Sequence, residues 1–397
     1  MEWKEYQIQD VCRLINGRAY SNDEMLEYGK YKIVRVGNLS GGNSTWFYSD
    51  LELPADKYCH NGDLLFAWAC TFGPHIWKED NTIFHYHIWK IVEDKDVVDR
   101  RFFYYYLKFA TGGFLGALNG SVMVHITKSS MEKMSIRIPK KLEDQRRIAS
   151  ILSSLDRKIE LNNKINADLE EMAQAIFKNW FVDLEPFKDG KFVDSELGMI
   201  PEGWKVGNIG DIVEFQNGFA FSSNDFSEYG EYKIITIKSV QDGCLLSEGS
   251  SKISEYPTKM PAYCKLQSGD ILLSLTGNVG RCCLVTEPHL LLNQRVAKIK
   301  AKESFDNSFS YALFRLKETK ELLISISRGT AQANLSPVEA SKLPMVIPSE
   351  DVRKKFSMFS DSIMDKIISI HIENSRLSLL RDTLLPRLMS GELEVPE

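Results

Sequence analysis

The side chains of this sequence that could do chemistry are suited to holding a phosphate or the edge of a base. The stretch "LTGNVGRCCLV" (275–285) places Thr276, Gly277, Asn278 and Arg281 between two apolar runs. Glycine lets backbone N–H groups approach a phosphate closely, and a guanidinium adds a charge-assisted contact. An ordinary hairpin turn that uses glycine for its positive φ accounts for the same residues equally well.

The stretch "NQRVAKIK" (293–300) alternates in polarity and predicts a strand. Gln294 and Lys298 would then share one face of the strand, and Arg295 would lie on the other. Glutamine and arginine can make two hydrogen bonds at once with adenine and guanine edges, respectively. Both are also common on solvated strand faces, so base contact stays a hypothesis for each.

A third polar stretch, "SRGTAQANLSP" (327–337), carries Arg328, Thr330, Gln332 and Asn334. Its counterpart nearer the N-terminus, "LNGSVMVHITK" (118–128), carries Asn119, Ser121, His125 and Lys128. Both stretches precede a long helical pattern, so their side chains either brace that junction or lie along a ligand.

Basic and amide residues also accompany two related strand patterns. Lys32, Arg35 and Asn38 lie in or after "YKIVRV", and Lys233 and Lys238 lie comparably around "YKIITI". Such residues at a strand end could contact phosphate and make binding depend on salt. Solvated surface charges are the alternative.

A metal centre is not expected from the histidines and cysteines. Those that crowd into the first 90 residues are Cys59, His60, Cys70, His75, His85 and His87. Their spacings fit no standard zinc site, and the second half has no equivalent group. The seven cysteines form no CxxC pair, and the first ten residues hold no apolar signal core, so we expect a reducing cytoplasm.

The charge balance does not indicate a nucleic-acid partner. The net charge is -5, and residues 1–142 carry 18 Lys/Arg against 17 Asp/Glu. Residues 202–349 carry 16 of each. A basic surface would therefore have to be made by arrangement.

An internal repeat organises all of these residues. "WKEYQIQDVCRLINGRAYSNDEMLEYGKYKI" (3–33) aligns without a gap with "WKVGNIGDIVEFQNGFAFSSNDFSEYGEYKI" (204–234). The match returns later at slightly larger offsets, where "NGDLLF" (61–66) meets "SGDILL" (268–273). The chain is thus two copies of one unit of about 200 residues.

Each copy predicts an α+β domain followed by a long helix. Alternating runs such as "DLLFAW" and "DILLSL" predict strands, and "RRFFYYYLKFA" and "FSYALFRLKETKELLISI" predict helices. The predicted domains are 1–142 and 202–349, the long helices are 143–182 and 350–391, and the linker is 183–201.

The two long helices show apolar spacings of three and four residues over more than four heptads, which favours an antiparallel coiled coil with a pseudo-twofold axis. The predicted seam holds Leu152, Leu155, Ile159, Asn166, Leu169, Ile363, Ile367, Ile370, Asn374 and Leu377. The alternative is two separate helices, each lying on its own domain. Asn166 and Asn374 occupy equivalent positions in the two copies, where a buried amide would fix the register. Amides that face water are the alternative.

Four stretches of the sequence resemble the specificity subunit of type I restriction-modification systems. They are "LEDQRRIASILSSLDRKIELNN" (142–163), "KNWFVDLEPFKDGKFVDSELGMIPEGW" (178–204), "GTAQANLSP" (329–337) and "LLPRLMSGEL" (384–393). The resemblance covers nearly the whole chain in order. Two departures are that the first copy starts almost at Trp3 and that "PSEDVRKKF" (348–356) stands where "LEDQRRI" stands in the first copy.

The resemblance implies two target-recognition domains that read a bipartite, asymmetric DNA site and no catalytic residue in this chain. It implies as partners double-stranded DNA, two adenine-N6 methyltransferase subunits, and restriction and translocase subunits. S-adenosylmethionine, ATP and Mg would bind to those subunits. It also favours placing the polar stretches 118–128 and 327–337 along DNA. The competing interpretation is a duplicated scaffold without DNA, which bridges two identical proteins through its coiled coil.

Overall fold

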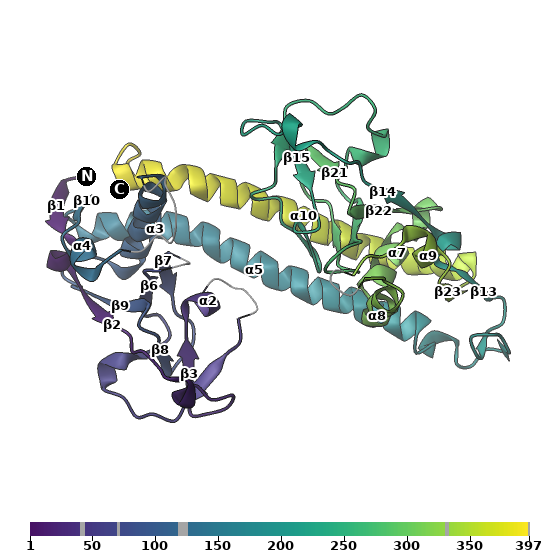
Figure 1. Cartoon of the computed structure of the whole chain (residues 1–397), viewed down its shortest axis with the longest axis horizontal. Coiled ribbons are helices and arrows are strands. Elements are labelled where there is room, and N and C mark those ends of the chain that lie inside the picture. Colours follow the sequence, from purple (N-terminus) through teal and green to yellow (C-terminus); the bar gives the residue numbers. More distant parts are fainter. Residues whose placement is uncertain (40–43, 70–71, 118–125, 330–332, 396–397) are drawn as a thin grey trace. The chain divides into compact units, whose positions relative to one another are not determined.

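The computed structural model describes residues 1–39, 44–69, 72–117, 126–329 and 333–395, without the side chains of residues 113–117. The chain forms two compact units, and the boundary between them falls within both long helices (Figure 1). Unit 1 comprises Met1–Lys158 and Leu377–Glu397, and unit 2 comprises Ile159–Arg376. Each unit mixes helices and strands, as the sequence predicts.

The core of unit 1 is a four-stranded antiparallel sheet with one long helix against it. The sheet order is β2 (Cys12–Asn16), β9 (Ile88–Glu93), β6 (Leu64–Ala67) and β7 (Gly73–Ile76). Helix α3 (Arg100–Ala117) begins after Asp99, whose carboxylate accepts the backbone N–H groups of Arg101 and Phe102. Phe102 and Phe103 then pack against the sheet residues Leu64 and Phe66. This places the helix on one face of the sheet.

A second sheet of unit 1 has the order β4 (Phe47–Ser49), β3 (Tyr31–Val34), β8 (Thr82–Phe84) and β5 (Tyr58–Cys59). Strands β3 and β8 run parallel, and the other pairs are antiparallel. Strand β1 (Trp3–Gln7) pairs antiparallel with β10 (Ser135–Pro139), which directly precedes the long helix. Short helices complete the unit: α1 (Ile8–Val11), α2 (Val36–Leu39) and α4 (Lys128–Glu132).

Unit 2 repeats this topology. Its four-stranded sheet has the order β14 (Val213–Asn217), β22 (Val296–Ala301), β19 (Ile271–Ser274) and β20 (Cys282–Leu284). Its second sheet is β18 (Lys252–Ile253), β15 (Tyr232–Ile235) and β21 (Leu290–Leu292), with β15 and β21 parallel. Strand β13 (Lys205–Asn208) pairs with β23 (Pro344–Ile347) as β1 pairs with β10. The smaller elements are α6 (Ile209–Ile212), α9 (Pro337–Ser341), β11 (Phe192–Val193), β12 (Ile200–Pro201), β16 (Val240–Gln241) and β17 (Cys244–Leu245).

Three boundaries predicted from the sequence are wrong. The helix expected over 309–326 is two helices, α7 (Asn307–Arg315) and α8 (Lys317–Ser325), because Leu316 takes an extended ψ of 134° and packs on the core. The strand expected over 31–36 ends at Val34, where the Asn38 side chain accepts the Arg35 N–H and starts α2. The strand expected over 293–300 begins only at Val296.

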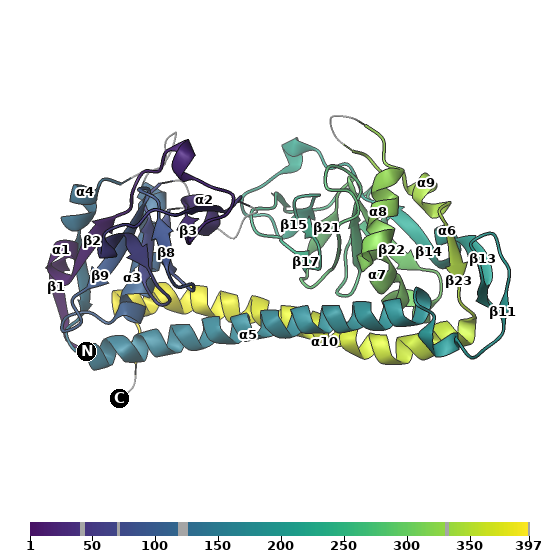
Figure 2. The same cartoon turned by 90° about the horizontal axis from the view of Figure 1, so that it is seen from below.

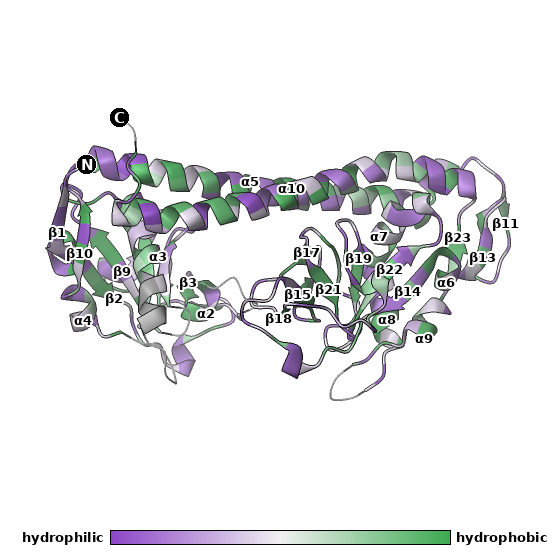
Figure 3. Ribbon diagram, turned by 90° about the horizontal axis from the view of Figure 1, so that it is seen from above, coloured by the Kyte–Doolittle hydropathy of each residue, from purple (hydrophilic) through white to green (hydrophobic). Residues whose placement is uncertain are grey.

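The long helices are α5 (Leu142–Phe181) and α10 (Glu350–Ser390), and they pack on each other within each unit (Figure 2). In unit 1, Ile148 and Leu152 of α5 share a core with Leu385 and Leu388 of α10. In unit 2, the Phe177 and Phe356 rings lie 5.7 Å apart. Early residues of α5 thus meet late residues of α10, and the reverse, so the helices run antiparallel in each unit. Figure 3 shows alternating hydrophobic and hydrophilic bands along both helices.

The predicted seam residues differ in burial. Leu152, Asn166, Ile367 and Ile370 are buried. Those of intermediate exposure are Leu155, Ile159, Leu169, Ile363, Asn374 and Leu377. A coiled-coil seam stays a prediction.

The amides of the helix pair are not equivalent. The Asn162 Nδ2 atom donates to Asn374 Oδ1 at 2.8 Å, and Asn374 Nδ2 donates to Asn163 Oδ1 at 2.9 Å. The side-chain oxygen and nitrogen of Asn166 are buried, with no hydrogen-bond partner among the residues that the structure describes. The repeat offset of 208 explains the difference, because Asn166 corresponds to Asn374, whereas the position of Asn162 is occupied by Ile370 in the second copy.

Leucine at these two asparagines should therefore have opposite effects on stability. Asn374→Leu removes the hydrogen bonds to Asn162 and Asn163, so that Asn162 keeps only its bond to Glu373, and it should lower the free energy of unfolding by about 1–3 kcal/mol. Asn166→Leu removes a buried amide that has no described partner and should raise it by about 1 kcal/mol. Urea denaturation of the full chain measures both. Shifts in the same direction would contradict this account.

Candidate nucleic-acid interface

Polar residues from distant parts of the sequence meet at one edge of the four-stranded sheet of unit 2. At this edge β14 and β19 end, β22 and β20 begin, and Asn217 pairs with Ala297 while Ser274 pairs with Val296. We call this the loop edge. It gathers residues 217–219, 275–281, 293–295 and 333–335, and in unit 1 the equivalent edge gathers residues 16–18, 68–69 and 85–87.

An Asn-Gly pair holds both loop edges together. A Cβ atom on Gly218 would lie 2.0 Å from the Asn293 carbonyl oxygen, and one on Gly17 would lie 2.2 Å from that of His85. Only glycine permits this approach, because any other residue would overlap the neighbouring backbone. The chain beyond each glycine is fixed by backbone bonds, such as Gln294 N to Phe219 O at 3.0 Å. Residues 293–295 and 85–87 are thus presented on the same backbone frame.

Three of the predicted residues in unit 2 come together at this edge. The Thr276 hydroxyl donates to Asn334 Oδ1 at 2.7 Å, and Arg295 Nη1 donates to the same oxygen at 3.5 Å. Thr276 is buried, so its role is to position Asn334. Arg295 is exposed and keeps most of its five N–H donors for a ligand. Gln294 beside it is also exposed.

The predicted turn between β19 and β20 is present and uses glycine for its backbone. Gly277 and Gly280 have φ values of 74° and 80°. Asn278 is exposed at the tip of the turn. The Arg281 guanidinium donates to the Gln241 side chain, which fixes its direction. The glycines therefore serve the turn, and Asn278 and Arg281 remain as the groups that could contact a ligand.

Lys298 is not available to contact a ligand, because it is held in an ion pair. Its Nζ atom lies 2.8 Å from Asp270, and each of these side chains is only 15% exposed. The first copy repeats the pair, with Lys90 Nζ 4.0 Å from Asp63. The lysine therefore anchors the sheet in both units.

Most of the other predicted basic residues already have partners in the fold. Lys32 Nζ lies 2.8 Å from Glu79, Lys233 Nζ lies 2.9 Å from Glu287, and Arg328 Nη2 lies 2.5 Å from Glu339. The remaining pairs are Lys128 with Glu132 at 3.6 Å and Arg35 Nη2 with the Thr45 carbonyl at 3.0 Å. Asn38 caps α2. Lys238 is exposed, and its side chain has no partner in the described part of the chain.

Some predicted residues cannot be placed. Asn119, Ser121, His125, Thr330 and Gln332 lie outside the described residues.

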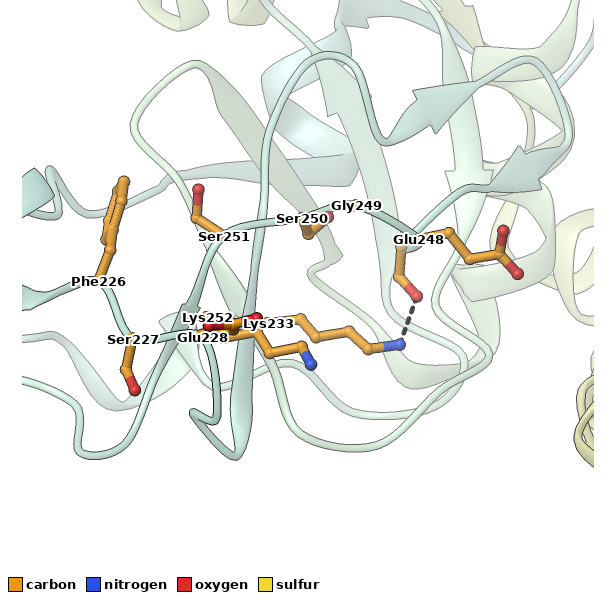
Figure 4. A pocket seen from close by; sticks show the side chains of 10 residues that line it. Phe226, Ser227, Glu228, Lys233, Glu248, Gly249, Ser250, Ser251 and Lys252 are labelled. Carbon is orange, nitrogen blue, oxygen red and sulfur yellow. Dashed lines mark hydrogen bonds between the residues drawn. The ribbon is translucent and has the colours of Figure 1, made fainter. Parts of the chain in front are cut away.

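A shallow pocket of unit 2 groups the predicted Lys233 with residues that the sequence did not single out. It encloses about 610 Å³, and its lining includes Lys233, Lys252 and the serines at 250 and 251. Lys233 and Lys252 are register partners in β15 and β18, and Figure 4 shows them side by side. Lys233 is paired with Glu287, whereas Lys252 has no ion pair among the described residues and could hold an anion.

The loop edge of unit 1 carries aromatic rings in place of amides and cations. Residues 85–87 are His85, Tyr86 and His87, where the second copy has Asn293, Gln294 and Arg295. Burial lowers the pKa of His85 to about 4, and burial also lowers the pKa of His87. Both imidazoles are therefore neutral at pH 7. The sequence analysis considered these histidines only as metal ligands, although the repeat aligns them with 293–295.

The described residues contain no group of three or more His, Cys, Asp or Glu side chains placed to hold a metal ion. In the same residues, every helix is too short or too polar to cross a membrane.

Two mixed α/β units with one topology and different side chains at the loop edge show a protein built from two related domains. A family model described as type I restriction modification DNA specificity domain matches residues 1–171 and 201–376. The chain belongs to this family of specificity subunits.

Relatives of known name agree. The chain is 26% identical to the type I restriction enzyme HindI specificity subunit of Haemophilus influenzae, over 99% of this chain and 100% of that protein. It is 30% identical to the MjaIX specificity subunit of Methanocaldococcus jannaschii, over 76% of this chain and 71% of that one. The crystal structure of the type I restriction-modification S subunit from M. genitalium shares the fold, with a TM-score of 0.55 and 17% identity, over 98% of this chain and 96% of that one.

We expect the substitution of Lys298, which is paired within the fold, to affect stability more than the substitution of Arg295, which is exposed. Lys298→Ala should lower the free energy of unfolding by about 1–3 kcal/mol, because it leaves the Asp270 side chain, which is only 15% exposed, without its ion-pair partner. Arg295→Ala should change stability by less than about 0.5 kcal/mol, because its side chain is exposed. Urea denaturation checks both values. Equal destabilisation by the two variants would show that Arg295 is also part of the scaffold.

Proposed function

We propose that the chain is the DNA-reading subunit of a type I restriction-modification complex and that each domain reads one half of a bipartite, asymmetric site. The observation that carries this proposal is the loop edge, which has the same backbone frame in both units and different side chains. An amide and a guanidinium at 294 and 295 suit adenine and guanine edges. Rings at the equivalent positions of unit 1 suit a different sequence, which accounts for the asymmetry.

The phosphate contacts we propose are few. Lys238 and Lys252 are two cations of unit 2 without an ion pair among the described residues, and Gln241 holds the Arg281 guanidinium at the turn between β19 and β20. Phosphate contacts of this kind would position the duplex without selecting its sequence. They would also make affinity fall as salt rises.

We further propose that α5 and α10 form an antiparallel coiled coil with pseudo-twofold symmetry and that its length sets the gap between the half-sites. Helices of 40 and 41 residues support this, because each is about 60 Å long at ~1.5 Å per residue. The antiparallel packing found within each unit supports the same arrangement.

The chain would act in the cytoplasm together with two adenine-N6 methyltransferase subunits and with restriction and translocase subunits. S-adenosylmethionine, ATP and Mg would bind to those subunits. This chain would hold the duplex while a methyltransferase subunit turns the target adenine out of the stack.

A map of N6-methyladenine in host DNA tests the function directly. Deletion of the gene should remove methylation at one split, asymmetric motif, and restoring the gene should return it. The control is a host strain that lacks the partner methyltransferase, which should lose the same motif. If the methyltransferase is expressed and the map does not change on deletion, the DNA-reading function is wrong and the scaffold gains support.

Exchange of one domain tests the division of the site. Replacing residues 1–142 with the same segment of another family member should change one half of the methylated motif and leave the other half unaltered. The reciprocal exchange of 202–349 should do the opposite. Changes in both halves after a single exchange would contradict the assignment of one half-site to each domain.

A further inference from the structure

A pocket at the loop edge of unit 1 has no role in the function proposed so far. It encloses about 420 Å³, which is within the range of ~300–1,000 Å³ typical of small-molecule sites. Its lining includes Trp68, Trp89, Tyr86, Asn16 and Thr127.

The walls of this pocket are rings that the fold holds in place. Phe66 stacks on Trp89 at 6.1 Å, and Trp89 stacks on Trp68 at 5.9 Å. The Tyr86 ring lies 6.2 Å from Trp68, whose indole N–H donates to the Tyr86 carbonyl at 2.8 Å. The ring series starts in the core and ends at Tyr86, which is 40% exposed. Such a surface is ready to stack a flat group without first ordering its side chains.

The lining of the pocket has little net charge, which favours a neutral ligand over a phosphate. His85 and His87 beside Tyr86 have lowered pKa values and carry no charge at pH 7. The lining residue Lys128 lies 3.6 Å from Glu132, which offsets its charge. The exposed Asn16 amide at the rim offers both a donor and an acceptor to the edge of a flat ligand.

The corresponding described positions of unit 2 carry no aromatic ring. The repeat places Leu275 at the position of Trp68, Gln294 at that of Tyr86, and Ala297 at that of Trp89. Instead, the backbone of Leu335 bonds to Leu275 there at 2.7 Å. The two loop edges therefore differ in the kind of contact that they offer. Unit 1 offers aromatic rings for stacking, and unit 2 offers polar groups for hydrogen bonds.

We propose that the pocket of unit 1 binds one nucleobase of its half-site, turned out of the duplex and stacked beside Tyr86 and Trp68. This inference rests on the proposed function, because it needs DNA at the loop edge. A base within the duplex has both faces covered by its neighbours, so it can enter a pocket on the protein only after it leaves the helix. Each base stacked on an aromatic side chain strengthens binding by about 5- to 100-fold.

Binding of duplexes with single abasic positions tests the proposal. The full chain, assembled with its methyltransferase subunits, is titrated with its own site as wild type, Tyr86→Ala, Tyr86→Phe and Tyr28→Ala. Tyr28 is 83% exposed and does not line the pocket, so it is the matched control. On the intact site, Tyr86→Ala should bind about 5- to 100-fold more weakly than wild type. Tyr86→Phe and Tyr28→Ala should bind like wild type.

The decisive measurement is the ratio of these affinities when one base is absent. An abasic residue at a single position of the first half-site should bring the ratio of the Kd values of Tyr86→Ala and wild type close to one. A mismatch at that position should strengthen wild-type binding, because an unpaired base leaves the duplex more easily.

Other outcomes overturn the proposal and separate it from the function on which it rests. If the ratio is the same at every abasic position, Tyr86 does not stack a base. If a mismatch at the responsive position weakens binding, the ring touches a base that stays inside the duplex. If wild type does not distinguish its site from a scrambled duplex, the proposed function itself fails.

Discussion

The structure depends on the packing of α5 against α10, because neither domain has a complete core without a helix from the other half of the chain. The core of unit 1 includes Leu385, Leu388 and Met389, which lie more than 200 residues beyond most of the side chains that they touch. In unit 2, Phe177 and Trp180 of α5 pack against Phe356 of α10. Removal of either helix would expose a large apolar surface in both units, so each domain is stable only as part of the whole chain.

Charged pairs fix the orientation of this packing. Asp156 of α5 accepts from Tyr105 of α3 at 2.7 Å and from Arg381 of α10 at 2.8 Å. In unit 2, Glu170 of α5 accepts from Arg315 of α7 at 3.1 Å and from Tyr311. Each carboxylate thus joins the long helix to the helix that packs on the four-stranded sheet. A shift of α5 along its axis would break these bonds while leaving much of the apolar contact in place, so the polar groups give the packing its precision.

The sequence predicts the architecture well, because the same pattern of strands and helices occurs in both copies of the repeat. Every element of the four-stranded sheet in one copy has a counterpart in the other, and the long helices follow from apolar spacing alone. The role of Lys298 could not be predicted from its position on a strand, since its partner Asp270 is brought close only by the pairing of β19 with β22. The break at Leu316 was missed because the pattern of apolar residues continues through it, while tertiary packing takes that leucine out of the helix.

The candidate interface was only partly predictable for a related reason. Polarity and spacing identify Arg295 and Asn334, but the contact between them spans 39 residues and depends on the approach at Gly218. The histidines at 85 and 87 drew attention only as metal ligands, and only alignment with the second copy places residues 85–87 at the loop edge. The repeat also separates the two kinds of residue. The Asn-Gly pair and the Lys–Asp pair appear in both copies and hold the frame, whereas residues 85–87 and 293–295 differ while their backbones keep the same bonds. Because these side chains differ while the backbone bonds of the frame are kept, the two domains present different chemistry on one scaffold.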